Sequence, residues 1–134
     1  MKQNIFKSNF LYLLSNIIFI IFSIFLIIGI IFQFINDFKV GRFACRIILL
    51  VLSLITFLKL LRRKNNAILF INAFIILSLP IILYNSFYIY STHYIYYPQY
   101  LYFSGMMIIY LIIVNKNKVD KNSINEIEEI GKLK

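Results

Sequence analysis

The stretch FLYLLSNIIFIIFSIFLIIGIIFQFI, residues 10–35, carries no charged side chain. A helix needs about 20 consecutive apolar residues to cross a bilayer core of about 30 Å. This stretch is longer than that requirement, so we expect its helix to tilt or to protrude from the core. It also exceeds the roughly 7–15 apolar residues of a signal-peptide core, and no small-residue cleavage site follows it, which favours an uncleaved signal anchor.

The whole chain has the composition of a membrane protein. Of its 134 residues, 61% are hydrophobic and 14% are charged, and the mean hydropathy is +0.84. Average soluble domains carry roughly 25% charged residues, and a soluble domain of this size has too little interior to bury so much apolar surface. We therefore expect one integral membrane domain over residues 1–134. The bias toward Ile, Phe, Asn, Lys and Tyr fits AT-rich codons, which favours the bacterial inner (cytoplasmic) membrane, with an organellar inner membrane as the alternative.

Three further segments complete an all-α bundle of four transmembrane helices. From Asn65 to Asn115 the chain has no Asp, Glu, Lys or Arg, which is too long for one span and long enough for two. The second span is the weakest, because only residues 47–58 lie between charges. It reaches the required length if the stems of Arg46 and Lys59 extend along the lipid toward the headgroups; a re-entrant or interfacial helix is the alternative. The predicted spans cover residues 10–35, 43–61, 67–88 and 96–114.

The positions of Lys and Arg in the short connections predict the orientation of the bundle. Placing both chain ends in the cytosol also places most basic residues there, so we predict an N-in, C-in arrangement. Lys39 and Arg42, between the first two spans, are the exception. The orientation signal is strongest in one basic turn, which we also expect to contact anionic lipid headgroups. This turn contains Lys59, Arg62, Arg63 and Lys64.

Eight of the ten tyrosines lie between Tyr84 and Tyr102. A Tyr side chain combines an apolar ring with a hydroxyl group, so it partitions to the headgroup level of a bilayer. We interpret this stretch as half of an interfacial aromatic belt around the third connection. A recognition surface is the alternative, because Tyr supplies a large contact area at low entropic cost. The belt residues we single out are Tyr88, Tyr90, Tyr94, Tyr96, Tyr97 and Tyr100.

Mildly polar side chains within the spans are the candidates for helix packing or partner contact. Residues seven apart share a helix face, which pairs Asn16 with Ser23 and Ser78 with Asn85. An amide in hydrocarbon needs a hydrogen-bond partner. That partner lies either inside the bundle or on another membrane protein. The candidates are Asn16, Ser23, Asn72, Ser78 and Asn85.

The sequence contains no recognisable catalytic or metal-binding set. Cys45 is the single cysteine and His93 the single histidine, and the spans contain no carboxylate. A nucleophile in the spans would have no base within reach, and a metal would lack ligands. We therefore expect no enzyme activity, no cofactor and no metal. The absence of intramembrane carboxylates also disfavours ion-coupled transport. The net charge of +9 reflects membrane orientation and not nucleic-acid binding.

Residues 115–134 are expected to form a cytosolic tail. Within it, Ser123 and Glu126 form a capping box that indicates a short helix over 123–130, ended by Gly131. Taken together, these features favour a small non-enzymatic membrane protein that binds the lipid bilayer and either another membrane protein or itself. It would act as an accessory protein, an immunity-type protein against membrane-active toxins, or a complex subunit. The alternative is a self-assembled channel or pore lined by Ser, Thr and Asn.

Overall fold

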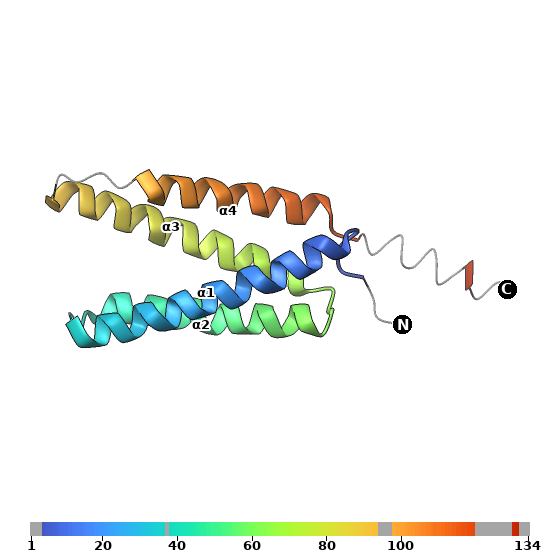
Figure 1. The fold of residues 1–134 in the computed structure, drawn as a ribbon, viewed down its shortest axis with the longest axis horizontal. Coiled ribbons are helices and arrows are strands. Elements are labelled where there is room, and N and C mark those ends of the chain that lie inside the picture. The colour runs from blue at the N-terminus through green and yellow to red at the C-terminus, as the bar shows by residue number, and fades with distance from the viewer. Residues whose placement is uncertain (1–3, 37, 94–97, 120–129, 132–134) are drawn as a thin grey trace.

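Four long helices make up the protein in a computed structural model that describes residues 4–36, 38–93, 98–119 and 130–131. The helices pack as two antiparallel hairpins, α1 with α2 and α3 with α4 (Figure 1). Each helix is long and apolar enough to cross a membrane. The predicted all-α, four-helix membrane bundle is therefore confirmed. The helices are α1 (Asn9–Asn36), α2 (Val40–Leu61), α3 (Ala67–His93) and α4 (Pro98–Lys116).

The helices extend past several of the predicted span boundaries. The weakest span of the sequence is one continuous helix of 22 residues, which is about 33 Å long. Helix α3 continues through Pro80 and on to His93, beyond the predicted end of the third span at residue 88. Helix α4 ends at Lys116, so the first two residues of the predicted tail are helical. The predicted tail helix over 123–130 lies outside the described residues, apart from Ile130.

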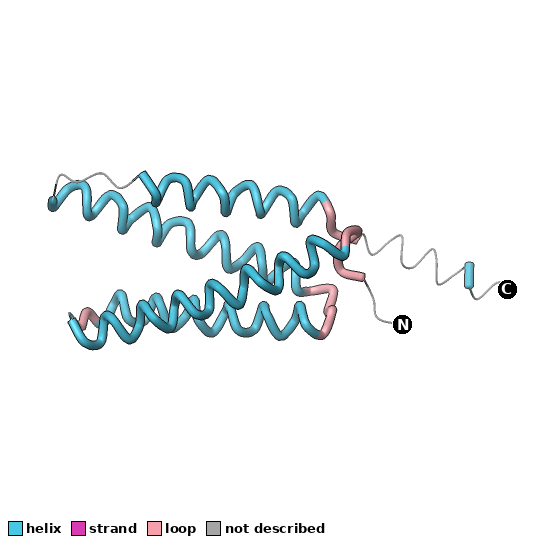
Figure 2. The backbone as a smooth tube through the Cα atoms, in the orientation of Figure 1, coloured by secondary structure: helices cyan, strands magenta, loops and turns pink. Residues whose placement is uncertain are grey.

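The two hairpins converge at one end of the bundle and diverge toward the other (Figure 1). We call the converging end the closed end. Three described loop segments lie there, namely residues 4–8, the α2–α3 turn and residues 117–119 (Figure 2). We call the other end, where α1 and α3 end and α2 and α4 begin, the open end. Because four antiparallel helices return the chain to its starting side, both ends of the helical region lie at the closed end.

A short backbone pairing fastens the closed end. Phe6 and Lys118 form an isolated antiparallel β-bridge. Beside it, the Lys7 N–H donates to the Asn117 carbonyl at 2.8 Å, and the Val119 N–H donates to the Ile5 carbonyl at 3.0 Å. We call these paired segments, residues 5–7 and 117–119, the terminal clasp. It holds the start of the chain to the residues that follow α4.

The core of the protein lies toward the closed end. Phe19 and Phe22 of α1 meet Phe74 of α3 at ring-centroid distances of 5.2 and 5.3 Å, and Phe22 meets Phe103 of α4 at 5.8 Å. Beyond Ser78, no described side chain of α3 is buried. The outer surfaces of the helices carry many exposed Ile, Leu and Phe side chains, which lipid can solvate and water cannot.

Candidate functional site

Two amides join α3 to α4 near the closed end. Nδ2 of Asn72 donates to Oδ1 of Asn115 at 3.0 Å, and Nδ2 of Asn115 donates back to Oδ1 of Asn72 at 2.9 Å. Nδ2 of Asn115 also donates to the Leu111 carbonyl at 2.8 Å. The structure thus gives the predicted packing residue Asn72 a partner. The sequence alone predicts Asn115 to lie in the tail, and only the antiparallel alignment of α3 and α4 brings the two amides together.

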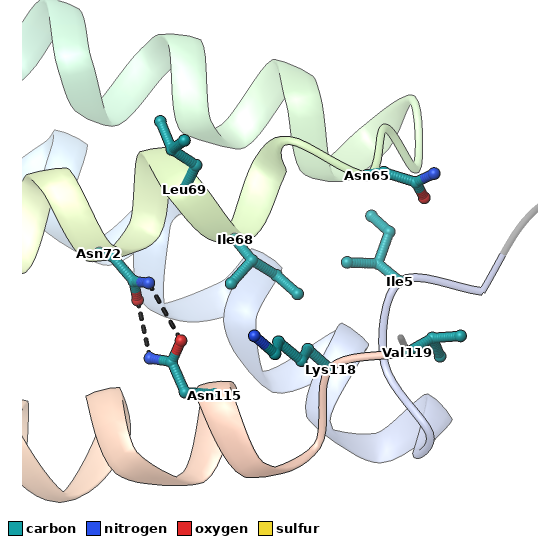
Figure 3. Close-up of a pocket in the computed structure, with 8 residues that line it drawn as sticks. All are labelled: Ile5, Asn65, Ile68, Leu69, Asn72, Asn115, Lys118 and Val119. Carbon is teal, nitrogen blue, oxygen red and sulfur yellow. Dashed lines mark hydrogen bonds between the residues drawn. The ribbon is translucent and has the colours of Figure 1, made fainter. Parts of the chain in front are cut away.

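A pocket of about 350 Å³ lies beside this amide pair, between the start of α3, the end of α4 and the terminal clasp (Figure 3). The side chain of Lys118 extends from the clasp toward the amide pair (Figure 3). One part of the lining is polar, and the other part is aliphatic. The polar residues are Asn65, Asn72, Asn115 and Lys118, and the aliphatic residues are Ile5, Ile68, Leu69 and Val119.

The predicted pair on α1, Asn16 and Ser23, bonds mainly inside the hairpin. Nδ2 of Asn16 donates to the Tyr12 carbonyl of the same helix at 2.9 Å. Oδ1 of Asn16 is buried and has no hydrogen-bond partner in the described part of the chain. Oγ of Ser23 donates to the Phe19 carbonyl at 2.8 Å and lies 2.8 Å from Oγ of Ser53 on α2. Ser23 therefore contributes to α1–α2 packing, whereas the Asn16 amide bonds within its own helix.

The predicted pair on α3, Ser78 and Asn85, lies on both sides of the point where the core ends. Ser78 is buried, and its hydroxyl group donates to the Ile75 carbonyl at 3.0 Å and lies 3.8 Å from Sδ of Met107. Asn85, two turns further along the same face, is half-buried. Among the described residues no hydrogen bond reaches its amide. The two residues share a face but not an environment.

A further polar contact joins α1 to α4. The Tyr110 hydroxyl donates to Oγ of Ser15 at 2.7 Å. Tyr110 lies outside the Tyr-rich stretch, and the sequence pattern gave no sign that it would face the interior of the bundle.

Arg46 departs from the arrangement expected of it. Its Nη1 donates to the Gly29 carbonyl of α1. Gly29 lies seven residues before the end of α1, and Arg46 lies six residues after the start of α2, so both are about 10 Å from their helix ends. The guanidinium group therefore crosses to the neighbouring helix and does not extend along the lipid toward the headgroups. A Cβ atom at position 29 would lie 3.4 Å from Nη1, so the glycine leaves room for this contact.

The basic turn ends α2 in a Schellman motif. The Arg63 N–H donates to the Leu60 carbonyl at 2.9 Å, and the Lys64 N–H donates to the Lys59 carbonyl at 3.0 Å. Arg63 occupies the position that normally holds glycine, with φ of 49°. A residue with a Cβ atom is strained there by about 1 kcal/mol or more.

Side-chain contacts explain why an arginine is accommodated in that turn. The Arg63 guanidinium lies 4.5 Å from the centroid of the Tyr12 ring, and its Nη1 donates to Oδ1 of Asn4 at 3.0 Å. Nζ of Lys59 similarly lies 5.3 Å from the Phe70 ring centroid. These two basic residues contact aromatic rings of the protein itself, whereas Arg62 and Lys64 are exposed.

The described tyrosines of the Tyr-rich stretch lie toward the open end, and several of them face outward. The exposed fractions of the Tyr84, Tyr90 and Tyr102 side chains are 65%, 51% and 72%, as an interfacial belt requires. The rings of Tyr84 and Tyr88 stack at 6.4 Å, and the Arg42 guanidinium lies 5.1 Å from the Tyr88 ring centroid. Tyr100 is half-buried. The remaining predicted belt residues, Tyr94, Tyr96 and Tyr97, lie outside the described residues, as does the His93 side chain.

The described residues contain no group of His, Cys, Asp and Glu that could hold a metal ion, and the single Cys45 is exposed and unpaired. Comparison with protein-family models, with curated proteins and with solved structures finds no match for this chain.

Proposed function

We propose that this small four-span membrane protein is a non-enzymatic accessory protein that binds a transmembrane segment of a partner at its open end. An immunity-type protein and a subunit of a membrane complex are both forms of this role. The membrane we propose is the bacterial inner membrane, with an organellar inner membrane as the alternative, because the codon-biased composition fits either.

One face of α3 supports this role. At the closed end the face is buried by the protein itself, at Ile71, Ile75 and Ser78. The same face continues toward the open end through residues that are only half-buried, namely Ile82, Asn85 and Ile89. The chain itself covers these three side chains only in part, which leaves the rest of the face for another molecule to cover.

The polar group on that face favours a protein over lipid as the covering molecule. Lipid tails can solvate Ile82 and Ile89, but they offer the Asn85 amide no hydrogen bond. A neighbouring helix can offer a backbone carbonyl or a polar side chain, and interhelical hydrogen bonds of this kind contribute about 0.6 kcal/mol on average and up to about 1.7 kcal/mol.

The channel alternative receives less support from the contacts of the two amides nearest the core. Asn72 is bonded to Asn115, and Nδ2 of Asn16 is bonded to the Tyr12 carbonyl. Because these groups form hydrogen bonds within one chain, they are not free to line a pore between chains, and we therefore favour the accessory role.

Photo-crosslinking in native membranes tests the proposal. A benzophenone amino acid at Ile89, on the proposed face, should give a protein adduct whose mass differs from that of a dimer of this chain. The same probe at Ile76, which is 60% exposed on a different face of α3, serves as the matched control and should give little of this adduct. Replacing Asn85 by Leu should lower the yield at position 89 by about threefold, the equivalent of one average interhelical hydrogen bond.

Two outcomes would contradict the accessory role. Equal protein adducts from positions 89 and 76 would indicate non-specific contact. An adduct only with a second copy of the chain would favour the self-assembled alternative.

A further inference from the structure

We propose that the pocket at the closed end binds the phosphate of an anionic phospholipid, with Lys118 as the main cationic contact. This inference concerns the opposite end of the bundle from the proposed partner site and does not depend on that site. The charge, the two-sided lining and the size of the pocket each point to this class of ligand.

The polar side of the pocket favours an anion. Lys118 lines it, and the terminal clasp fixes the backbone on both sides of this residue through the hydrogen bonds at Lys7 and Val119. Its ammonium group therefore extends from a segment whose backbone is held by hydrogen bonds.

The surroundings strengthen the positive potential at the pocket. The closed end also carries Lys7, Arg62, Lys64 and Lys116. Helix α3 begins at Ala67, beside Asn65 and Ile68 of the lining, and the positive end of a helix dipole attracts anions. Basic pockets between transmembrane helices are known sites for anionic lipid headgroups.

The aliphatic side favours a lipid over a free anion. Ile5, Ile68, Leu69 and Val119 form this side (Figure 3), and a fully hydrated inorganic phosphate would gain nothing from them. Leu69 is 65% exposed on the outer surface of α3, so the pocket opens toward the lipid. The acyl chains could then lie along α3 while the phosphate reaches Lys118.

The size of the pocket limits how much of the lipid it holds. Its volume of about 350 Å³ is near the lower end of ligand pockets, which run from about 300 to 1,000 Å³. It therefore fits a phosphate and its glycerol ester better than a complete lipid. The Asn65 side chain at the rim is exposed and can donate to a phosphate oxygen.

Native mass spectrometry of the full-length chain in a mild detergent tests the assignment. Phosphatidylglycerol should bind at least fivefold more tightly than phosphatidylcholine. Lys118→Gln should weaken phosphatidylglycerol binding about fivefold, the effect of one basic residue beside an anionic headgroup. The matched control is Lys116→Gln, which removes an exposed charge from the same end of α4 but does not line the pocket, and it should change binding by less than about twofold.

A second pair of variants tests the aliphatic side without changing the charge. Leu69→Trp should narrow the pocket and reduce phosphatidylglycerol binding. Leu77→Trp, at another exposed position of α3, should not. Circular dichroism of each variant confirms that its helices are intact, so that lost binding is not lost folding.

Three results would overturn the proposal. Equal binding of phosphatidylglycerol and phosphatidylcholine would exclude recognition of the anionic headgroup. Equal losses of phosphatidylglycerol affinity in Lys118→Gln and Lys116→Gln would mean that general surface charge, and not the pocket, attracts the lipid. If inorganic phosphate at millimolar concentration displaced the lipid completely, the pocket would be a free-anion site, because the aliphatic side would then contribute no affinity.

Discussion

The paired amides of Asn72 and Asn115 should account for a measurable share of the stability of the bundle. Replacing Asn72 by Leu, which has a similar volume, removes two interhelical hydrogen bonds of 3.0 and 2.9 Å. At about 0.6 kcal/mol per bond on average and at most about 1.7 kcal/mol, the two bonds together contribute about 1–3 kcal/mol. Asn115 keeps its bond to the Leu111 carbonyl, so only its Oδ1 loses a donor. We expect each single substitution to lower the free energy of unfolding by about 1–2 kcal/mol.

The double variant Asn72→Leu/Asn115→Leu should cost less than the sum of the two single changes. Both partners are then apolar, and no amide is left without its counterpart. The coupling energy should be about 1 kcal/mol, measured by titrating a denaturing detergent into mixed micelles and following the helical circular dichroism. Asn65→Leu, at an exposed pocket residue without a described hydrogen bond, is the control. Additive single and double effects would refute the reasoning, because they would mean that the amides do not contact each other.

Three other expectations concern the turn after α2, the glycine beside Arg46 and the orientation of the bundle. Arg63→Gly and Arg63→Ala both lose the guanidinium contacts, but only Gly adopts a φ of 49° without strain. The free energy of unfolding of the Gly variant should therefore be about 1 kcal/mol higher than that of the Ala variant. Equal values for the two variants would contradict a strained backbone at position 63. Gly29→Leu should displace the Arg46 guanidinium and lower the free energy of unfolding by about 1 kcal/mol. The control is Gly105→Leu, because no described atom lies within 4 Å of its Cβ position, and it should change the free energy of unfolding by less than about 0.5 kcal/mol. A larger loss for Gly105→Leu than for Gly29→Leu would contradict this packing. In a variant without Cys45, the N-in, C-in orientation predicts that a membrane-impermeant thiol reagent labels Thr92→Cys in intact cells. The same reagent should label Lys64→Cys only after lysis. The opposite labelling pattern would show that the orientation is the reverse of the predicted one.

The helices were predictable, but the terminal clasp was not. Long uncharged segments mark a membrane helix wherever they occur, and the four segments found in the sequence correspond to four helices. The clasp is made by backbone hydrogen bonds between residues 5–7 and 117–119, and these leave no pattern of side chains. For that reason the sequence alone predicts that Lys118 lies in a tail, whereas in the structure it lines a pocket.

The contacts of the basic residues were only partly predictable. Their number and position along the chain indicate orientation, because each charge has a cost of transfer that depends on the side of the membrane. Their individual contacts depend on which neighbour is within reach. Arg63 meets the Tyr12 ring and Arg46 meets the Gly29 carbonyl, and each of these pairs joins segments that are distant in sequence.

The sequence by itself determined that the protein is an integral membrane protein with four helices. Transfer of apolar residues from water to hydrocarbon adds up along the chain without reference to any neighbour, so the run at 10–35 is informative alone. Tertiary structure decided which polar groups meet, such as Asn72 with Asn115 and Ser23 with Ser53. In a membrane the lipid-facing and protein-facing sides of a helix are both apolar, and the sequence therefore does not mark how each helix is rotated in the bundle.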